Sequence, residues 1–438
     1  MAILTLGILF FLAHALSLLF EKTAVPDVLV LMLMGIVAGP VLGIVSPESF
    51  GEVGETMSSI ALVAILFEGG MSLDLQRLGT TVKASLPVFL STFLGSMALG
   101  ALAGVFLLKL PLLPSLTFGC IIASISPAVA LPLAKTLKLE RSTTDRLTIE
   151  TSLTDVFSII LVFTFTSAVG GANISVGRML GSILSSLIFA AVIGLVASYV
   201  WLRMLSWVRK FPNTNLATFF FLFIVFGVSD FLGFSGAIAS LAFGLGVANK
   251  PFAFVERMRG KELPPLSSIA EGERSFFDEI IFLLKTFFFV YLGISMRFAS
   301  PVIIALGLGL VVAIYLLRFF SVRQLLPRET LRRDVRYSSI MAPKGLASAV
   351  LAGLPLAAGM AGAEEIRDAA YIIVFFSIVL TAALVTAFER TRLAGHFDRL
   401  LRGFPAPIRP VLLVSPGTHP HADAGSETEP DVTGKIGG

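Results

Sequence analysis

The stretch MAPKGL at residues 341–346 places a proline and a lysine in the middle of an otherwise apolar segment, 336–358. The segment 112–134 is interrupted in the same way by SISP at residues 124–127. A proline with polar neighbours breaks a membrane helix, and the break is tolerated only where the freed backbone groups meet protein or line a cavity. The sequence therefore predicts two interrupted membrane helices.

The composition is that of a membrane protein. Apolar residues make up 55% of the 438 residues and charged residues 14%, and the mean hydropathy is +0.90. A soluble domain has about 25% charged residues, so these values exclude an ordinary soluble enzyme, a disordered chain and a nucleic-acid-binding protein. The single cysteine, Cys120, lies in an apolar run. This excludes disulfide bonds within the chain and a cysteine-based metal cluster.

Thirteen stretches approach the roughly 20 apolar residues that a membrane helix requires. The apolar N-terminus has no basic region and no cleavage site, so it is predicted to be the first span and not a signal peptide. The sequence thus predicts an all-α polytopic membrane protein with thirteen transmembrane helices. The predicted spans are 2–20, 25–45, 57–73, 85–107, 112–134, 143–169, 176–202, 215–232, 234–249, 278–296, 300–322, 336–358 and 368–389.

The basic residues orient this topology. Of the 33 lysines and arginines, 26 fall on one side of the predicted spans, 4 on the other, and the remaining three lie inside spans. Because basic loop residues concentrate on the cytoplasmic side, the N-terminus is predicted outside and the C-terminus inside, in the cell membrane. Residues 1–395 would form the transporter domain, and residues 396–438 a largely disordered cytoplasmic tail.

The two interrupted segments occupy matching places in the chain. Each is the fifth of six spans in its half, with spans 1–6 forming one half and spans 8–13 the other. Matched interruptions are typical of inverted-repeat transporters, which bind their substrate near the middle of the membrane. We therefore expect inverted six-helix repeats with interrupted helices five and twelve.

Asp155 is the first candidate for the transport site because it lies near the middle of the span 143–169. An ionisable group inside the bilayer is costly and by default marks a transport path or a proton relay. Thr151 precedes Asp155 by one helical turn, which places both on one face. A hydroxyl and a carboxylate there suit a small cation or a proton. The alternative is a buried aspartate that only forms a hydrogen bond with Thr151.

Glu150 and Arg318 lie at similar predicted depths, so we expect them to neutralise each other. Asp155 would then be the unpaired carboxylate of its span. The alternative is that Arg318 extends its side chain toward the headgroups. Glu68, at the inner end of the third span, either lines a cytoplasmic funnel, contacts the ion, or is a helix-end carboxylate near the headgroups.

Four motifs together resemble those of the monovalent cation:proton antiporters, sodium/proton exchangers of the NhaP type. The resemblance extends over residues 1–395. It implies a six-helix core domain, an interleaved dimerisation domain, a homodimer, and a crossing of spans five and twelve beside the ion site. The motifs are LFEGG at 66–70, ETSLTD at 150–155, FFFVYLG at 287–293 and APKGLA at 342–347.

The resemblance also implies roles for single residues. Asp155 would be the carboxylate shared by cation and proton, with Thr151 as a further ligand, and Glu150 would pair with Arg318. The predicted ion-binding set is Asp155, Thr151, Thr154, Ser126 and Glu68, with Lys344 as the charge of the interrupted helix. The chain has Thr154 where the family usually has asparagine or aspartate, Ser126 where it usually has aspartate, and Lys344 where arginine is common.

The predicted function is secondary active antiport of a monovalent cation, with Na⁺ favoured, for H⁺ by alternating access. One unpaired carboxylate in span six favours electroneutral exchange. The alternatives are a K⁺/H⁺ antiporter, a degenerate antiporter acting as a regulator, and a cation channel. The spans contain no Ser/His or metal-ligand set suited to an intramembrane enzyme. We expect no cofactor beyond the transported cation and H⁺, and no nucleic-acid partner.

Overall fold

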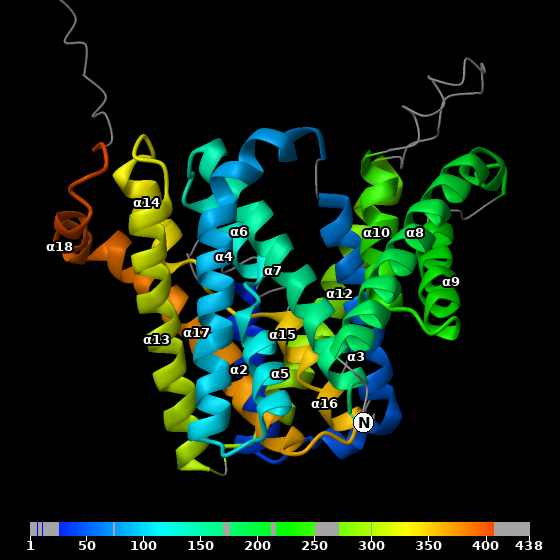
Figure 1. Cartoon of the computed structure of the whole chain (residues 1–438), viewed down its shortest axis with the longest axis horizontal. Helices are drawn as coiled ribbons and strands as arrows, with labels where there is room; N and C mark the ends of the chain where they lie inside the picture. Colours follow the sequence, from blue (N-terminus) through cyan, green and yellow to red (C-terminus); the bar gives the residue numbers. More distant parts are fainter. Residues whose placement is uncertain are drawn as a thin grey trace, which may run out of the picture.

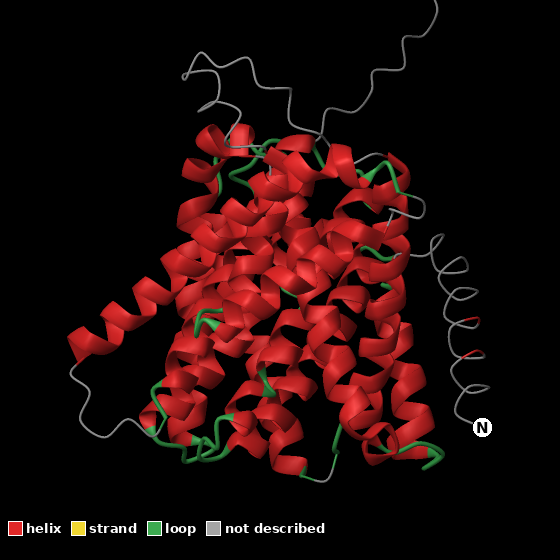
Figure 2. Ribbon diagram, turned by 90° about the vertical axis from the view of Figure 1, so that its right-hand side faces the viewer, coloured by secondary structure: helices red, strands yellow, loops and turns green. Residues whose placement is uncertain are grey.

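A computed structural model describes residues 26–72, 75–169, 176–211, 216–249, 271–298 and 300–406, together with Gly7 and Phe11. All regular structure in these ranges is helical, as Figure 2 shows. This confirms the all-helical class predicted from the sequence. The first predicted span, 2–20, and the last part of the tail, 407–438, fall outside the described residues.

The helices follow the predicted spans closely along the chain. Span two is α2 (Asp27–Ile36), which continues as a π-helical turn (Val37–Val41) around Pro40. The other single helices are α3 (Gly51–Ser72), α4 (Leu75–Phe106), α7 (Arg141–Ser167), α8 (Val176–Val208), α9 (Ala217–Phe231), α10 (Gly236–Asn249), α12 (Glu271–Ser295), α13 (Pro301–Leu325) and α17 (Ala363–Arg390).

Both predicted interruptions are present. The fifth span consists of α5 (Leu112–Ala123) and α6 (Pro127–Thr136), separated by three non-helical residues. The twelfth consists of α14 (Arg332–Ile340), α15 (Leu346–Leu351) and α16 (Leu354–Ala357). Proline begins α6, where its missing N–H leaves no hydrogen bond unmade.

Helix length and hydropathy agree with a polytopic membrane protein. Six described stretches are long and apolar enough to cross a membrane. Five shorter apolar helices accompany them; the interrupted fifth span is one of the six long stretches, and the second part of the twelfth, Leu346–Ala357, is one of the five shorter ones. Spans eight and nine are separate helices, because the chain turns at Gly233 with a φ of +80° that favours glycine.

The helices pack in two sets. In one set, α4, α5, α7, α13 and α17 contact one another; in the other, α3, α8, α9, α10 and α12 do so, with α2 against α12 (Figure 1). The short helix α15 contacts α5, α7 and α17 of the first set and α3 and α12 of the second. The interrupted twelfth span therefore lies where the two sets meet.

The described structure continues past residue 395, where the sequence predicted the membrane domain to end. Residue 395 lies inside a further helix, α18 (Leu393–Leu400), which packs against α14 and α17. Beyond it, Leu401 and Phe404 are buried. Composition alone suggested disorder from residue 396, but the first residues of this segment are anchored on α14 and α17 by a few buried side chains. The described chain therefore packs against the helices as far as Phe404.

Candidate ion-binding site

The two helix breaks cross and are joined by their backbones. The backbone N–H of Ser126 donates to the carbonyl of Pro343 at 2.8 Å. Gly345 lies directly against the Ser126 side chain, so that a Cβ at this glycine would collide with it. One freed backbone group of each break is therefore satisfied by the other, as the bilayer requires.

Asp155 of α7 lies beside this crossing. Its side chain is buried, with 9% of the residue exposed, and it accepts a hydrogen bond from the Ser124 hydroxyl in the first break. The neighbouring Thr154 fixes the break to α7, because its hydroxyl accepts from the backbone N–H of Ile125 at 3.1 Å and donates to the Thr151 carbonyl at 2.8 Å. The non-helical residues of span five are thus held against the middle of α7.

The hydroxyl that donates to Asp155 belongs to Ser124 and not to Thr151, the partner considered as the alternative from the sequence. The Thr151 side chain is fully buried, and its hydroxyl donates to the Thr148 carbonyl at 3.1 Å. Helical spacing correctly places Thr151 one turn from Asp155, but the partner of the carboxylate comes from another helix. Ser124 belongs to the SISP motif that marks the break. The SISP motif in the sequence marks the break, but the spacing of its two serines does not show which of them faces Asp155.

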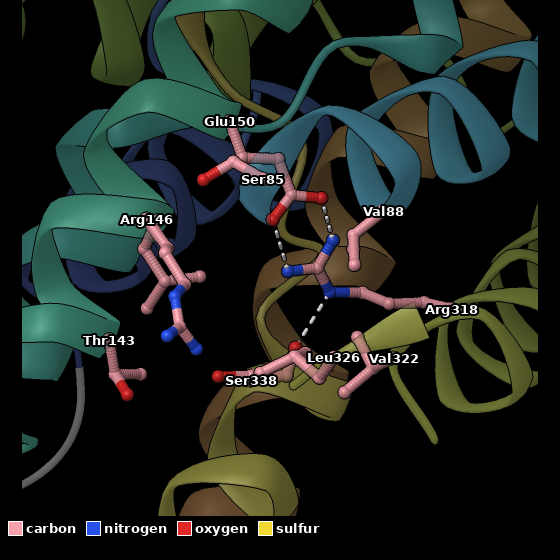
Figure 3. Close-up of a pocket in the computed structure, with 10 residues that line it drawn as sticks. Ser85, Val88, Thr143, Arg146, Glu150, Arg318, Val322, Leu326 and Ser338 are labelled. Carbon is pink, nitrogen blue, oxygen red and sulfur yellow. Dashed lines mark hydrogen bonds and ion pairs between the residues drawn. The ribbon is translucent and has the colours of Figure 1, made fainter. Parts of the chain in front are cut away.

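Glu150 and Arg318 form a buried bidentate ion pair (Figure 3). The two nitrogen–oxygen distances are 2.6 and 3.0 Å. The Arg318 Nε donates to the Ser338 carbonyl at 2.8 Å, and the Thr92 hydroxyl donates to Glu150 at 3.1 Å. Only 1% of Arg318 is exposed, so it does not extend to the headgroups. The pair connects α7, α13, α14 and α4.

A cavity of about 20 Å³ adjoins this ion pair, which is room for about one water molecule. Thr143 lines this cavity, and its buried hydroxyl has no hydrogen-bond partner within the described part of the chain. Arg146 also faces it and donates to the Thr330 hydroxyl at 2.9 Å.

Lys344, the predicted charge of the interrupted twelfth span, is buried inside the protein. It is 99% buried in the second break, where its backbone N–H donates to the Ser377 hydroxyl at 2.8 Å, and only 1% of the residue is exposed. Its charge acts through space on Asp155, Glu150 and Arg318. A basic residue therefore lies near Asp155 even though Arg318 pairs with Glu150. The site contains one carboxylate and one ammonium group that do not form a contact ion pair.

Two further predicted residues have distinct surroundings. The Ser126 hydroxyl is buried against Gly345 and has no hydrogen-bond partner among the described residues. Glu68 is half-buried on α3, and the charged groups that act on it are those of Lys285, Asp278 and Arg274 on the packed helix α12, and of Lys135. The structure thus brings Ser126 to the crossing with Asp155 and places Glu68 in a separate charged cluster.

Buried polar oxygens at crossed, interrupted membrane helices define the chain as a helical membrane protein of the secondary-transporter type. No group of three or more His, Cys, Asp or Glu side chains suited to a tightly held metal occurs in the part of the chain that the structure describes. Residues 7–388 match the family described as "Sodium/hydrogen exchanger, transmembrane". The chain belongs to this family, which confirms the resemblance seen in the motifs.

Curated relatives agree with this assignment. The Na⁺/H⁺ antiporter 1 of Methanocaldococcus jannaschii is 24% identical over 369 residues, covering 80% of this chain and 82% of the relative. The K⁺/H⁺ antiporter NhaP2 of Shewanella oneidensis is 25% identical over 390 residues, covering 86% of this chain but 64% of the relative. A chain from the structure of the sodium proton antiporter MjNhaP1 of M. jannaschii at pH 8 superposes with a TM-score of 0.70 at 22% identity. The match covers 92% of this chain and 98% of that one, and shows the shared fold.

Proposed function

We propose that this exchanger-family protein exchanges Na⁺ for H⁺, with Asp155 as the carboxylate that holds either ion. The observation that carries the proposal is the environment of that side chain. Asp155 is buried at the crossing of two broken helices, accepts a hydrogen bond from one hydroxyl, and has no contact ion pair among the described groups. A carboxylate in such a place must hold a cation or a proton.

The oxygens around Asp155 are suited to a small cation. A Na⁺ ion at the carboxylate would meet hydroxyl oxygens that are near or unused, and hard oxygen donors suit hard cations. The Ser124 hydroxyl donates to Asp155 and can rotate to present a lone pair, and the Ser126 hydroxyl has no partner to lose. Thr154 and Thr151 complete the proposed ligand set, and Glu68 is proposed to line the funnel that leads to it.

Competition at one carboxylate couples the two ions. The proton that leaves Asp155 is replaced by one cation, and the reverse exchange occurs on the other side of the membrane, so each cycle moves no net charge. Lys344 lies buried in the second break and is not part of the proposed ligand set. The two helix sets, proposed as core and dimerisation domains, would move relative to each other to expose Asp155 alternately.

K⁺ is the second candidate cation, because several curated relatives named as K⁺/H⁺ antiporters match this chain. The test uses everted membrane vesicles with an imposed acid interior and a quenched pH-sensitive dye. We expect addition of Na⁺ to restore fluorescence, with a half-saturating concentration lower for Na⁺ than for K⁺. Restoration by K⁺ alone would transfer the assignment to K⁺. A proton flux that does not saturate with either cation would instead indicate a channel.

Ser124 should contribute more to cation affinity than Thr151. Removing one neutral hydrogen-bonding ligand costs about 0.5–1.5 kcal/mol, which corresponds to a two- to tenfold change. We expect Ser124→Ala to raise the half-saturating cation concentration by this factor. Thr151→Val should raise it less, because the Thr151 hydroxyl already donates to Thr148. The half-saturating cation concentration of each variant is measured in vesicles with equal protein content. Equal increases in Ser124→Ala and Thr151→Val would contradict the hydrogen bonds that distinguish the two hydroxyls.

The full topology also belongs to the proposal. We propose thirteen transmembrane helices in a homodimer in the cell membrane, with two inverted six-helix repeats, the N-terminus outside and the C-terminus in the cytoplasm. In a Cys120→Ser background, a cysteine at the exposed Arg399 should react with a membrane-impermeant maleimide only in everted vesicles. A cysteine at the exposed Lys109 should react only in intact cells. Reaction of the Arg399→Cys variant in intact cells would reverse the orientation.

A further inference from the structure

The helix α18 has an inner face that is tightly bound to the rest of the protein. Phe397 packs against Phe319 of α13 and Phe388 of α17, with ring centroids 5.1 Å apart in both pairs. Asp398 forms an ion pair with Arg336 of α14 at 2.7 Å. These contacts fix the rotation of α18 about its axis.

The residues after α18 secure the same arrangement. The backbone N–H of Arg332 donates to the Pro405 carbonyl at 2.8 Å, and its guanidinium donates to the Phe404 carbonyl at 2.8 and 3.2 Å. The buried Phe404 ring also lies 5.0 Å from the guanidinium of Arg328. The outer face of α18 therefore cannot turn inward without breaking both anchors.

The exposed side of α18, its outer face, combines apolar and basic side chains. Leu393 and Leu400 lie one helical turn before and after Phe397, at the edge where the outer face meets the inner one, and they are 44% and 51% exposed. Arg392 and Arg399 are seven residues apart and are also exposed, on the flank of the leucines. Exposed leucines beside arginines on a short amphipathic helix are typical of a helix that lies in the interface of a membrane.

The position of α18 agrees with this interpretation. Figure 1 shows α18 at one edge of the molecule, beside α14. Its contact residue Phe319 is followed by Phe320, which is half-exposed on the membrane helix α13, and the next helical turn presents the exposed Arg323. The outer face of α18 thus adjoins the exposed surface of α13, at the place along α13 where the exposed apolar Phe320 is followed by the basic Arg323.

We propose that the outer face of α18 binds anionic phospholipids of the adjacent leaflet, the cytoplasmic one in the proposed orientation. The guanidinium groups of Arg392 and Arg399 would bind the lipid phosphate, for which their planar donors are well suited. Leu393 and Leu400 would enter the region of the acyl chains. This inference depends on the contacts of α18 and is independent of which ion the protein transports.

Bound lipid would act on the crossing through the inner face of α18. The ion pair of Asp398 and the anchors on Arg332 both end on α14, whose C-terminus leads into the break that carries Lys344. Lipid that holds α18 at the membrane surface therefore also holds α14. We expect anionic lipid to stabilise the folded protein against thermal unfolding.

The test measures lipid binding directly. The full chain in a neutral detergent is titrated with phosphatidylglycerol or phosphatidylcholine while its unfolding temperature is followed, and native mass spectrometry counts the retained lipids. Each arginine near an anionic surface contributes about a fivefold gain in binding, so R392Q/R399Q should weaken phosphatidylglycerol binding about 25-fold. R392K/R399K should retain most of the binding, since the charge remains.

A matched control removes two positive charges at the other end of the helices. K109N/R297Q changes the net charge equally, affects only exposed side chains, and keeps a residue type at position 109 that tolerates its φ of 55°. This control should bind phosphatidylglycerol as the wild type does. Three results would each overturn the proposal: unchanged binding in R392Q/R399Q, equal stabilisation by phosphatidylcholine, or displacement of the lipid effect by millimolar inorganic phosphate, which would indicate a site for free anions.

Discussion

Asp155→Asn is expected to fold as the wild type does and to lose cation-dependent proton movement completely. Asparagine keeps the size of the side chain and can still accept the hydrogen bond of Ser124, which anchors the first helix break. It cannot exchange a proton for a cation, because its amide does not titrate. The measurement is dye dequenching in everted vesicles, with the amount of folded protein determined by size-exclusion chromatography.

Asp230→Asn is the matched control for this experiment, because Asp230 is an exposed carboxylate of another membrane helix, away from the crossing. It should exchange as the wild type does. In the wild type, a higher proton concentration should raise the half-saturating cation concentration without lowering the maximal rate, as competition for one carboxylate requires. Cation-coupled proton movement in well-folded Asp155→Asn protein would contradict both the site and the mechanism.

A second crossing variant, Gly345→Val, tests the geometry without removing a charge. Any Cβ at this position meets the Ser126 side chain, and the backbone hydrogen bond from Ser126 to Pro343 holds the two breaks at that separation. We expect a lower unfolding temperature and weaker exchange, whereas Gly309→Val on the open side of α13 should change neither. An unaltered unfolding temperature in Gly345→Val would show that the breaks are not in close contact.

The sequence predicts most of the helices because hydropathy and the cost of exposed backbone in lipid act over about 20 residues at a time. The prolines likewise mark both breaks, since proline cannot continue the helical hydrogen bonds. The partner of Asp155 could not be predicted in this way. Residues in a break do not follow helical periodicity, so spacing does not show that Ser124 faces Asp155 while Ser126 faces Gly345.

The burial of Lys344 and the anchoring of α18 could not be predicted from the sequence, for related reasons. A lysine next to a break can extend along the helix to the headgroups or remain inside, and packing of the two breaks decides for the inside position. In the segment after residue 395, polar composition suggested disorder. The structure depends instead on a few specific contacts, such as Asp398 with Arg336 and the Phe404 carbonyl with Arg332, which average composition does not register.

Breaking the pair of Glu150 and Arg318 is expected to have the largest effect on stability. Both side chains are almost completely buried, and removal of one partner of a buried pair typically costs about 3–5 kcal/mol because the other charge remains uncompensated. Glu150→Gln leaves a buried guanidinium, and Arg318→Met leaves a buried carboxylate. Each should strongly reduce the fraction of protein that remains monodisperse after heating in detergent.

Double variants separate the pair from two independent losses. E150L/R318M removes both charges and should be more stable than either single variant, since no isolated charge remains. E150R/R318E should recover only part of the stability, because a glutamate at position 318 cannot donate to the Ser338 carbonyl as the Arg318 Nε does. The Thr92 hydroxyl, which donates to Glu150, would have to turn and accept from the new arginine. Losses that simply add in E150L/R318M would show that the two residues do not stabilise the protein as a pair, whatever their distance.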